Sequence, residues 1–320
     1  MIKKNVYEKI RGLLNLTRIK EWWLISFSFI IFAYVPHIYR IHDNMRLEYI
    51  IALFLSPPIY LTTIIVFSAQ IFLFAGNDYF DRHVDALDRE KRNRNPVCSG
   101  KVNKNEVWIL LGVSAIISLL VSILYNFQTL IFTTISLFVF YFYTAEPIRF
   151  KKRVGFDIIT HAIFINVFPY FSAMIALWDF HFEALFILFI FIARSSVAQL
   201  LQEIRDYDVD KKVEKNTVIV IGRRTATKII FIIWSLVLFT TIILLIAYQL
   251  FSIGLRLFFI LIVFICIIYA PSFYKLLTSK NYPKLIESLW VGNGKTSPRI
   301  AGYYLVTISV YLFIVFFFLL

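Results

Sequence analysis

Cysteine is scarce in this chain of 320 residues, which has only Cys98 and Cys266. Cys98 lies in a polar segment and Cys266 in an apolar run, so we expect two free thiols rather than a disulfide. A cleavable signal peptide is also not expected, because the first 21 residues are charged and no small-residue cleavage site follows them. The sequence therefore gives no sign of a secreted protein built on disulfide cross-links.

Apolar residues, in contrast, are abundant. The chain is 59% hydrophobic and 18% aromatic, contains 34 phenylalanines, and has a mean hydropathy of +0.74. A soluble domain of this size could not bury so much apolar surface, so lipid must be the solvent. Nine runs approach the length of a transmembrane helix. They are Trp22–Tyr39, Tyr49–Phe74, Val107–Tyr125, Leu130–Tyr143, Phe156–Trp178, Phe182–Leu201, Ile229–Tyr248, Leu255–Pro271 and Ile300–Leu320. The sequence predicts an all-α integral membrane protein, and Pro57-Pro58 predicts a kink or the true start of the second helix.

The basic residues sort to one side of these predicted spans. The N-terminal tail and the loops after spans two, four, six and eight hold 29 of the 33 lysines and arginines. The other loops hold only Arg40, Arg46 and Arg256, and Arg194 lies within a span. This asymmetry predicts a cytoplasmic N-terminus and a C-terminus on the opposite side. The net charge of +13 then fits anionic lipid headgroups and an anionic substrate better than nucleic acid.

Two acidic motifs repeat 125 residues apart, each where a long apolar run ends. The first is Asn77-Asp78-Tyr79-Phe80-Asp81-Arg82-His83-Val84-Asp85, and the second is Gln202-Glu203-Ile204-Arg205-Asp206-Tyr207-Asp208-Val209-Asp210. Their spacing predicts two similarly oriented four-helix repeats and a ninth helix in one domain over residues 1–320, with a short cytoplasmic segment at residues 1–21. Sites in repeats of this kind lie between the halves.

The motifs carry the residue types of a divalent-metal site. Asp81 and Asp85 are four residues apart, so a helix places them on one face, with Asn77 extending the stripe. Like charges at this spacing repel unless a cation lies between them. Solvated helix ends are the alternative explanation, but two motifs in register favour a site. Carboxylate and amide oxygens suit Mg²⁺. The predicted metal ligands are Asn77, Asp81, Asp85, Asp206 and Asp210.

Basic residues surround both motifs and suit a diphosphate leaving group, on which charge develops as the bond breaks. The candidate diphosphate-binding residues are Lys91, Arg94, Arg149, Lys151 and Lys211. Their competing explanation is membrane topology alone. A diphosphate site at the mouth of an apolar helix bundle predicts a substrate with a lipid tail. Loss of diphosphate would leave an allylic cation, which an aromatic face such as that of Tyr143 can stabilise.

Taken together, these motifs resemble the signatures of the UbiA superfamily of intramembrane prenyltransferases. Asn77-Asp78-x-x-Asp81-x-x-x-Asp85 is similar to the first signature, and Asp206-x-x-x-Asp210 to the second. Tyr143-x-x-x-Pro147-x-Arg149-x-Lys151 is similar to the basic element after the fourth helix of the family. The resemblance implies nine helices and Mg²⁺-dependent prenyl transfer, with Asp81, Asp206 and Tyr143 as catalytic candidates. One departure is Asn95, which stands directly before Pro96 where many members have arginine.

The resemblance leaves the acceptor open, and we expect a lipophilic or aromatic molecule. Two other functions also remain open. A terpene cyclase on the same fold would need no acceptor. A lipid-diphosphate transporter would suit parallel repeats, but both charged motifs lie at one predicted face, which argues against transport.

Overall fold

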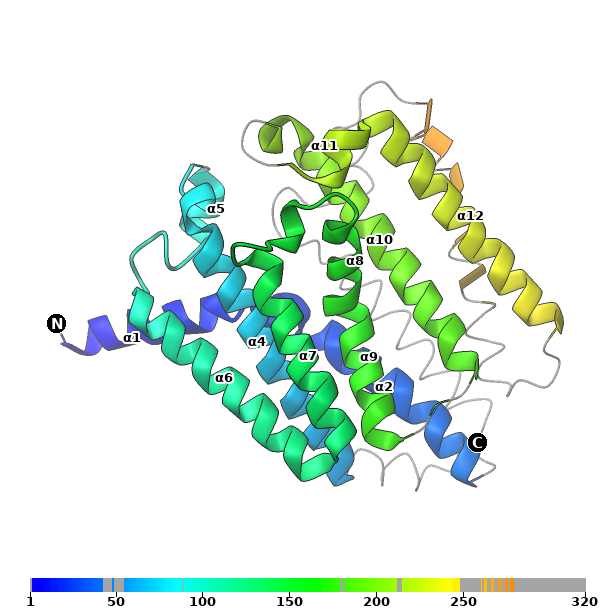
Figure 1. The fold of residues 1–320 in the computed structure, drawn as a ribbon, viewed down its shortest axis with the longest axis horizontal. Helices are drawn as coiled ribbons and strands as arrows, with labels where there is room; N and C mark the ends of the chain where they lie inside the picture. The colour runs from blue at the N-terminus through cyan, green and yellow to red at the C-terminus, as the bar shows by residue number, and fades with distance from the viewer. Residues whose placement is uncertain are drawn as a thin grey trace. The chain divides into compact units, whose positions relative to one another are not determined.

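In the computed structural model, all regular elements within the described residues are helical (Figure 1). The structure describes residues 2–42, 48, 55–87, 89–178, 180, 182–211, 215–247 and isolated positions between 260 and 278. The chain divides into two compact units. The first unit comprises Met1–Tyr34 with Ser56–Phe180, and the second comprises Val35–Leu55 with His181–Leu320. The first acidic motif belongs to the first unit and the second motif to the second unit.

The first unit is built around α4 (Pro57–Asp85), which packs against α6 (Lys104–Tyr125), α7 (Phe127–Thr144) and α9 (Phe168–Leu177). Its other elements are α1 (Ile2–Leu16), the first part of α2 (Ile19–His42), α5 (Arg89–Arg94), η1 (Phe150–Lys152), α8 (Phe156–Ala162) and η2 (Ile163–Val167). The Pro57-Pro58 pair marks the true start of α4, because proline in the first helical turn has no hydrogen bond to lose.

Polar contacts inside this unit connect its apolar helices. The Ser26 hydroxyl donates to Gln70 Oε1 at 2.6 Å, and Gln70 Nε2 donates to the Phe164 carbonyl at 3.3 Å. Phe164 lies in η2, a π-helical turn, so its carbonyl accepts a bond from outside its own helix. Such interhelical bonds stabilise packing where the hydrophobic effect between helices is weak. They join α2, α4 and η2, and so help fix α4, whose last turns carry the first motif.

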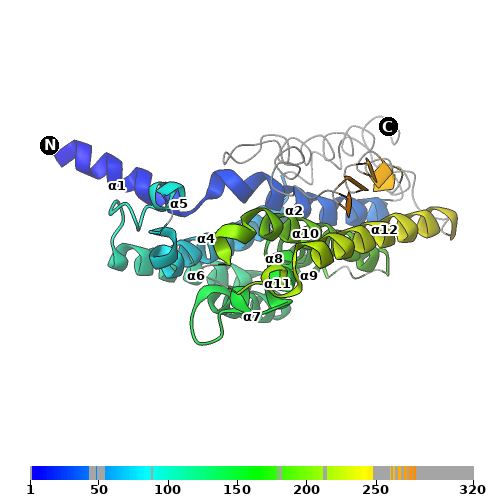
Figure 2. The ribbon, with the colours of Figure 1, turned by 90° about the horizontal axis from the view of Figure 1, so that it is seen from above.

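The second unit contains α10 (Phe182–Asp210), α11 (Thr217–Ile221) and α12 (Arg223–Ala247), with α10 packing against the other two (Figure 2). Both α4 and α10 continue well past the apolar runs that predicted them, Tyr49–Phe74 and Phe182–Leu201. Each acidic motif therefore lies on the last turns of a long helix, as its four-residue spacing predicts.

Five helical segments within the described residues are long and apolar enough to cross a membrane. They are Pro57–Asp85, Lys104–Tyr125, Phe127–Thr144, Phe156–Leu177 and Arg223–Ile243. The predicted run Ile300–Leu320 and most of Leu255–Pro271 lie outside the described residues. Within the described residues, the all-helical class and the presence of helices able to cross a membrane are therefore confirmed, whereas the count of nine helices in two repeats stays a prediction.

Candidate active site

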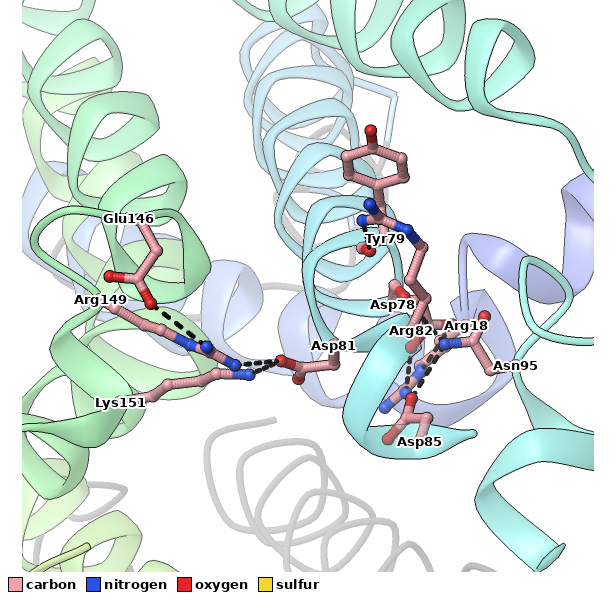
Figure 3. Close-up of polar contacts among 10 residues, drawn as sticks. All are labelled: Arg18, Asp78, Tyr79, Asp81, Arg82, Asp85, Asn95, Glu146, Arg149 and Lys151. Carbon is pink, nitrogen blue, oxygen red and sulfur yellow. Dashed lines mark hydrogen bonds and ion pairs between the residues drawn. The ribbon is translucent and has the colours of Figure 1, made fainter. Parts of the chain in front are cut away.

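Asp81 is the point where the first motif meets the basic loop after α7. Its Oδ1 accepts a hydrogen bond from Arg149 Nη2 at 3.2 Å and forms an ion pair with Lys151 Nζ (Figure 3). All three side chains are largely buried, with exposed fractions of 14% for Asp81, 13% for Arg149 and 11% for Lys151. An ion pair at this degree of burial is screened far less than one on the surface. The structure thus gathers one predicted metal ligand and two predicted diphosphate ligands.

The loop after α7 turns these two cations toward Asp81. Arg149 adopts the left-handed conformation with φ of 45°, and its N–H donates to the Ala145 carbonyl at 2.9 Å. Arg149 Nη1 also donates to Glu146 at 3.3 Å. Arg153, in the same loop, is exposed and donates from Nε to its own loop, at the Ile148 carbonyl, at 2.6 Å. Position in this loop, rather than positive charge alone, therefore decides which cations contact the motif.

Asp78 is held inside the first unit by a cation that the sequence did not predict. The side chain of Asp78 is 2% exposed and pairs with the guanidinium of Arg18, whose Nε lies 3.4 Å from Asp78 Oδ2. Arg18 follows α1 and has a φ of 46°. Burial by itself lowers the pKa of Arg18, but the attraction of Asp78, Glu21 and Asp85 together with the hydrogen bond to Asp78 more than offsets it, so the pKa is raised. Figure 3 shows Asp78 and Asp81 directed to different sides of α4.

Asp85, the last carboxylate of the first motif, is contacted by Asn95. Asp85 is 8% exposed and Asn95 only 1% exposed. Asn95 Nδ2 donates to Asp85 Oδ2 at 2.9 Å and to the Asp78 carbonyl at 2.8 Å, and Asn95 Oδ1 accepts from the Val97 N–H at 2.9 Å. The other Asp85 oxygen accepts no hydrogen bond from a described residue. One oxygen of this carboxylate is therefore held by the Asn95 amide.

The carboxylates of the second motif also have polar partners within their own unit. Asp206 accepts two hydrogen bonds from Arg205, at 2.7 and 3.0 Å, and Asp210 Oδ2 accepts from Asn216 at 3.4 Å. The hydrogen bond to Asp206 is the main cause that raises the pKa of Arg205, and the negative charges of Asp206 and Asp210 add to it. Glu203 is 5% exposed and accepts from the Val218 N–H at the start of α11 at 3.1 Å. Asp78 and Glu203 occupy equivalent positions in the two motifs, and each carboxylate is buried in a contact within its own unit.

The remaining predicted residues differ in their burial and in their neighbours. Tyr143 packs edge-on against Phe164, with ring centroids 4.5 Å apart. On α5, Lys91 is half-buried and Arg94 is exposed, and Asn77 is half-buried on α4. Lys211 is exposed in the second unit, with Nζ 5.9 Å from the Tyr207 ring centroid. Sequence reasoning missed Arg18 and the structural use of Asn95 and Asn216. Of these three residues, only Asn95 is marked in the sequence, because it stands directly before Pro96 where many family members have arginine.

The oxygen atoms of the first motif fit a hard divalent cation but do not complete its coordination. Among the described residues, no group of three or more histidine, cysteine, aspartate or glutamate side chains is gathered as a metal site. The first unit offers the Asp81 and Asp85 carboxylates and the Asn77 amide. Mg²⁺ is commonly held by one or two carboxylates, with water and substrate phosphate completing the shell. This donor set is chemically suited to that arrangement.

Several solved structures have a similar fold. The chain superposes on a UbiA homologue from Archaeoglobus fulgidus bound to DMAPP and Mg²⁺, with a TM-score of 0.69, 19% identity, and coverage of 95% of this chain and 98% of that one. The GPP- and Mg²⁺-bound form gives a TM-score of 0.70, again with 19% identity and coverage of 95% and 98%. A digeranylgeranylglyceryl phosphate synthase structure gives a TM-score of 0.66 with 18% identity over 96% and 97%.

At these identities the superpositions show a shared fold. No curated protein sequence matches the chain. The sequence profile of the UbiA prenyltransferase family, however, matches residues 50–291, a stretch that includes both acidic motifs and the basic loop between them. This chain therefore belongs to the UbiA prenyltransferase family, a family of membrane-embedded enzymes.

Proposed function

We propose that the protein transfers a prenyl group from a prenyl diphosphate to a lipophilic or aromatic acceptor and releases diphosphate, with Mg²⁺ as cofactor. In this proposal the metal ligands are Asn77, Asp81, Asp85, Asp206 and Asp210. The diphosphate-binding residues are Lys91, Arg94, Arg149, Lys151 and Lys211. Asp81, Asp206 and Tyr143 take part in catalysis.

The observation that carries the proposal is the cluster of Asp81, Arg149 and Lys151. Arg149 and Lys151 both contact one carboxylate oxygen of Asp81 at a largely buried position. In the proposal, both cations exchange this oxygen for the oxygens of a diphosphate. A diphosphate offers the two cations more negative charge than Asp81 does. Once the cations bind its oxygens, Asp81 is released to bind a metal. The same three side chains therefore serve a metal and a diphosphate that enter together.

The chemistry assigned to each residue follows from its charge and place. Mg²⁺ supplies a Lewis acid that stabilises negative charge on the leaving diphosphate. Arg149 and Lys151 donate charge-assisted hydrogen bonds to the diphosphate oxygens, and these strengthen as the allylic carbon–oxygen bond breaks. The half-buried ring of Tyr143 on α7 presents an aromatic face to the allylic cation left behind.

The fold relatives support the substrate class. The Archaeoglobus fulgidus homologue binds DMAPP or GPP together with Mg²⁺. The strongly apolar candidate spans suit a prenyl tail and a lipophilic acceptor. We also propose nine helices in two repeats, with the N-terminus and both acidic motifs on the cytoplasmic side and the C-terminus opposite. The concentration of 29 of 33 basic residues in the N-terminal tail and alternate loops supports this orientation.

Turnover of labelled geranylgeranyl diphosphate by purified protein tests the proposal. We expect diphosphate release that requires Mg²⁺ and an added acceptor. Release without any acceptor would indicate a cyclase or hydrolase, and movement of intact substrate across vesicles without release would indicate transport. Asp81→Ala and Asp206→Ala should abolish turnover while the protein stays folded. Asp208→Ala is the matched control, because Asp208 is exposed and pairs with Arg223. Full activity of either motif variant at low Mg²⁺ would rule out the shared metal.

A further inference from the structure

Two asparagines outside the predicted site each contact the last carboxylate of an acidic motif. Asn95 Nδ2 donates to Asp85 Oδ2 at 2.9 Å, and Asn216 Nδ2 donates to Asp210 Oδ2 at 3.4 Å. Asp85 and Asp210 occupy the same position in the two motifs. Both asparagines are buried, with exposed fractions of 1% and 7%. The same bond thus occurs at equivalent places in the two units.

Backbone contacts fix which end of each amide faces the carboxylate. Asn95 Oδ1 accepts from the Val97 N–H at 2.9 Å, and Asn216 Oδ1 accepts from the Ile219 N–H at 2.9 Å as the N-cap of α11. A rotated amide would set its NH₂ group against these N–H donors. Since an ionised carboxylate only accepts hydrogen bonds, the observed orientation satisfies both ends of each amide.

The local folds that supply the two asparagines are different. Asn95 lies ten residues beyond Asp85, after the short helix α5, whereas Asn216 lies six residues beyond Asp210, directly before α11. A shared loop structure therefore does not explain the shared bond. What the two cases have in common is the carboxylate at the end of the motif.

We propose that Asn95 and Asn216 are positioning residues that orient Asp85 and Asp210 toward the divalent cation of the proposed function, on which this inference rests. Each amide holds one carboxylate oxygen and restricts rotation of the side chain that carries the proposed ligand. Partners of this kind behind a metal ligand influence affinity strongly, although they do not touch the metal.

Serine substitution separates this role from a purely local one. Serine is a good N-cap and can accept the same backbone N–H bond in a turn, but its side chain is too short to reach the carboxylate. Mn²⁺ binding to the detergent-solubilised full chain, followed by electron paramagnetic resonance without substrate, gives a readout independent of turnover. We expect Asn95→Ser and Asn216→Ser each to weaken Mn²⁺ binding about 10- to 100-fold. Activity of both variants should recover as the Mg²⁺ concentration is raised.

Asn126→Ser is the matched control. Asn126 caps α7 by accepting from the Thr129 N–H at 2.7 Å, and its amide makes no hydrogen bond to a described carboxylate. Mn²⁺ affinity should be unchanged in this variant. Equal weakening in Asn126→Ser, or lost activity that Mg²⁺ does not restore, would assign the asparagines a local structural role and overturn the inference.

The parent protein distinguishes failure of the inference from failure of the proposed function. If the parent binds no Mn²⁺, the metal site itself is refuted, and the positioning role with it. If the parent binds Mn²⁺ and both serine variants bind it equally well, only the positioning role is refuted. Should Asn95→Ser not fold, Asn216→Ser decides alone, because unchanged binding there removes the correspondence between the two motifs.

Discussion

Replacing Lys151 by glutamine tests whether the basic loop acts at specific atoms or through general positive potential. Lys151 and Arg149 contact the same oxygen of Asp81, and both side chains are largely buried. Glutamine keeps most of the length of lysine but removes its charge. In the substrate-free protein, Asp81 then loses one of its two cationic partners, so Mg²⁺ affinity should be maintained or increased. With prenyl diphosphate present, the loop loses one of its two donors to the leaving group.

The size of the effect follows from comparable losses in other enzymes. Removal of one preorganised donor to a developing negative charge lowers kcat about 100- to 1,000-fold, or roughly 2.7–4 kcal/mol. Because Arg149 still contacts the same region, we expect Lys151→Gln to lie near the lower end of this range, with a raised KM for the prenyl diphosphate. Steady-state kinetics at several Mg²⁺ concentrations measure both quantities.

Arg153→Gln is the internal control for Lys151→Gln. Arg153 lies two residues away and has the same charge, but it is exposed and bonds the Ile148 carbonyl. Its replacement should leave kcat and KM close to the parent values. Equal damage in both variants would show that the loop acts through its summed charge, and the assignment of Lys151 would be wrong. No effect in either would reduce the basic loop to a topology signal.

Three further results are expected. Arg18→Met should destabilise the protein by about 3–5 kcal/mol, because it leaves Asp78 buried without its cation; thermal unfolding should show recovery when Asp78→Leu is added, and no recovery would contradict the buried pair. In a cysteine-free background, Arg94→Cys and Asp179→Cys should react with an impermeant thiol reagent from opposite sides of the membrane; labelling from one side refutes the nine-span topology. Burial, reinforced by nearby carboxylates, raises the pKa of the Cys98 thiol, so its alkylation should be slower than that of free cysteine at pH 8 and still rising above pH 9; a rate that levels off below pH 9 would contradict this.

The sequence predicted the helical, membrane-spanning class and the residues of the acidic motifs because both depend on local patterns. Apolar runs mark spans whatever their neighbours are, and a four-residue spacing places Asp81 and Asp85 on one helix face. The sequence also predicted Arg149 and Lys151 as diphosphate-binding candidates, and the structure places both beside Asp81 of the first motif.

The partners of Asp78 and Asp85 were not predictable in the same way. Arg18 lies sixty residues before Asp78, in a turn where any basic residue reads as a topology signal. Asn95 is an uncharged residue in a polar loop, a setting in which asparagine normally needs no special explanation. Only the packing of the loop between α4 and α6 against the end of α4 reveals that its amide is buried against a carboxylate.

In the first motif, contacts with other parts of the protein offset the repulsion between neighbouring carboxylates. Three carboxylates within eight residues repel one another, and the end of a helix adds partial negative charge. Each carboxylate nevertheless has a compensating partner: Arg18 for Asp78, two loop cations for Asp81, and the Asn95 amide for Asp85. Of these partners, only the cations on Asp81 are among the proposed diphosphate-binding residues. A metal that binds alone must compete with them, whereas a metal that arrives with a diphosphate does not. In the proposed function, this arrangement favours joint binding of cation and substrate, with Asp81 as the carboxylate whose partners change.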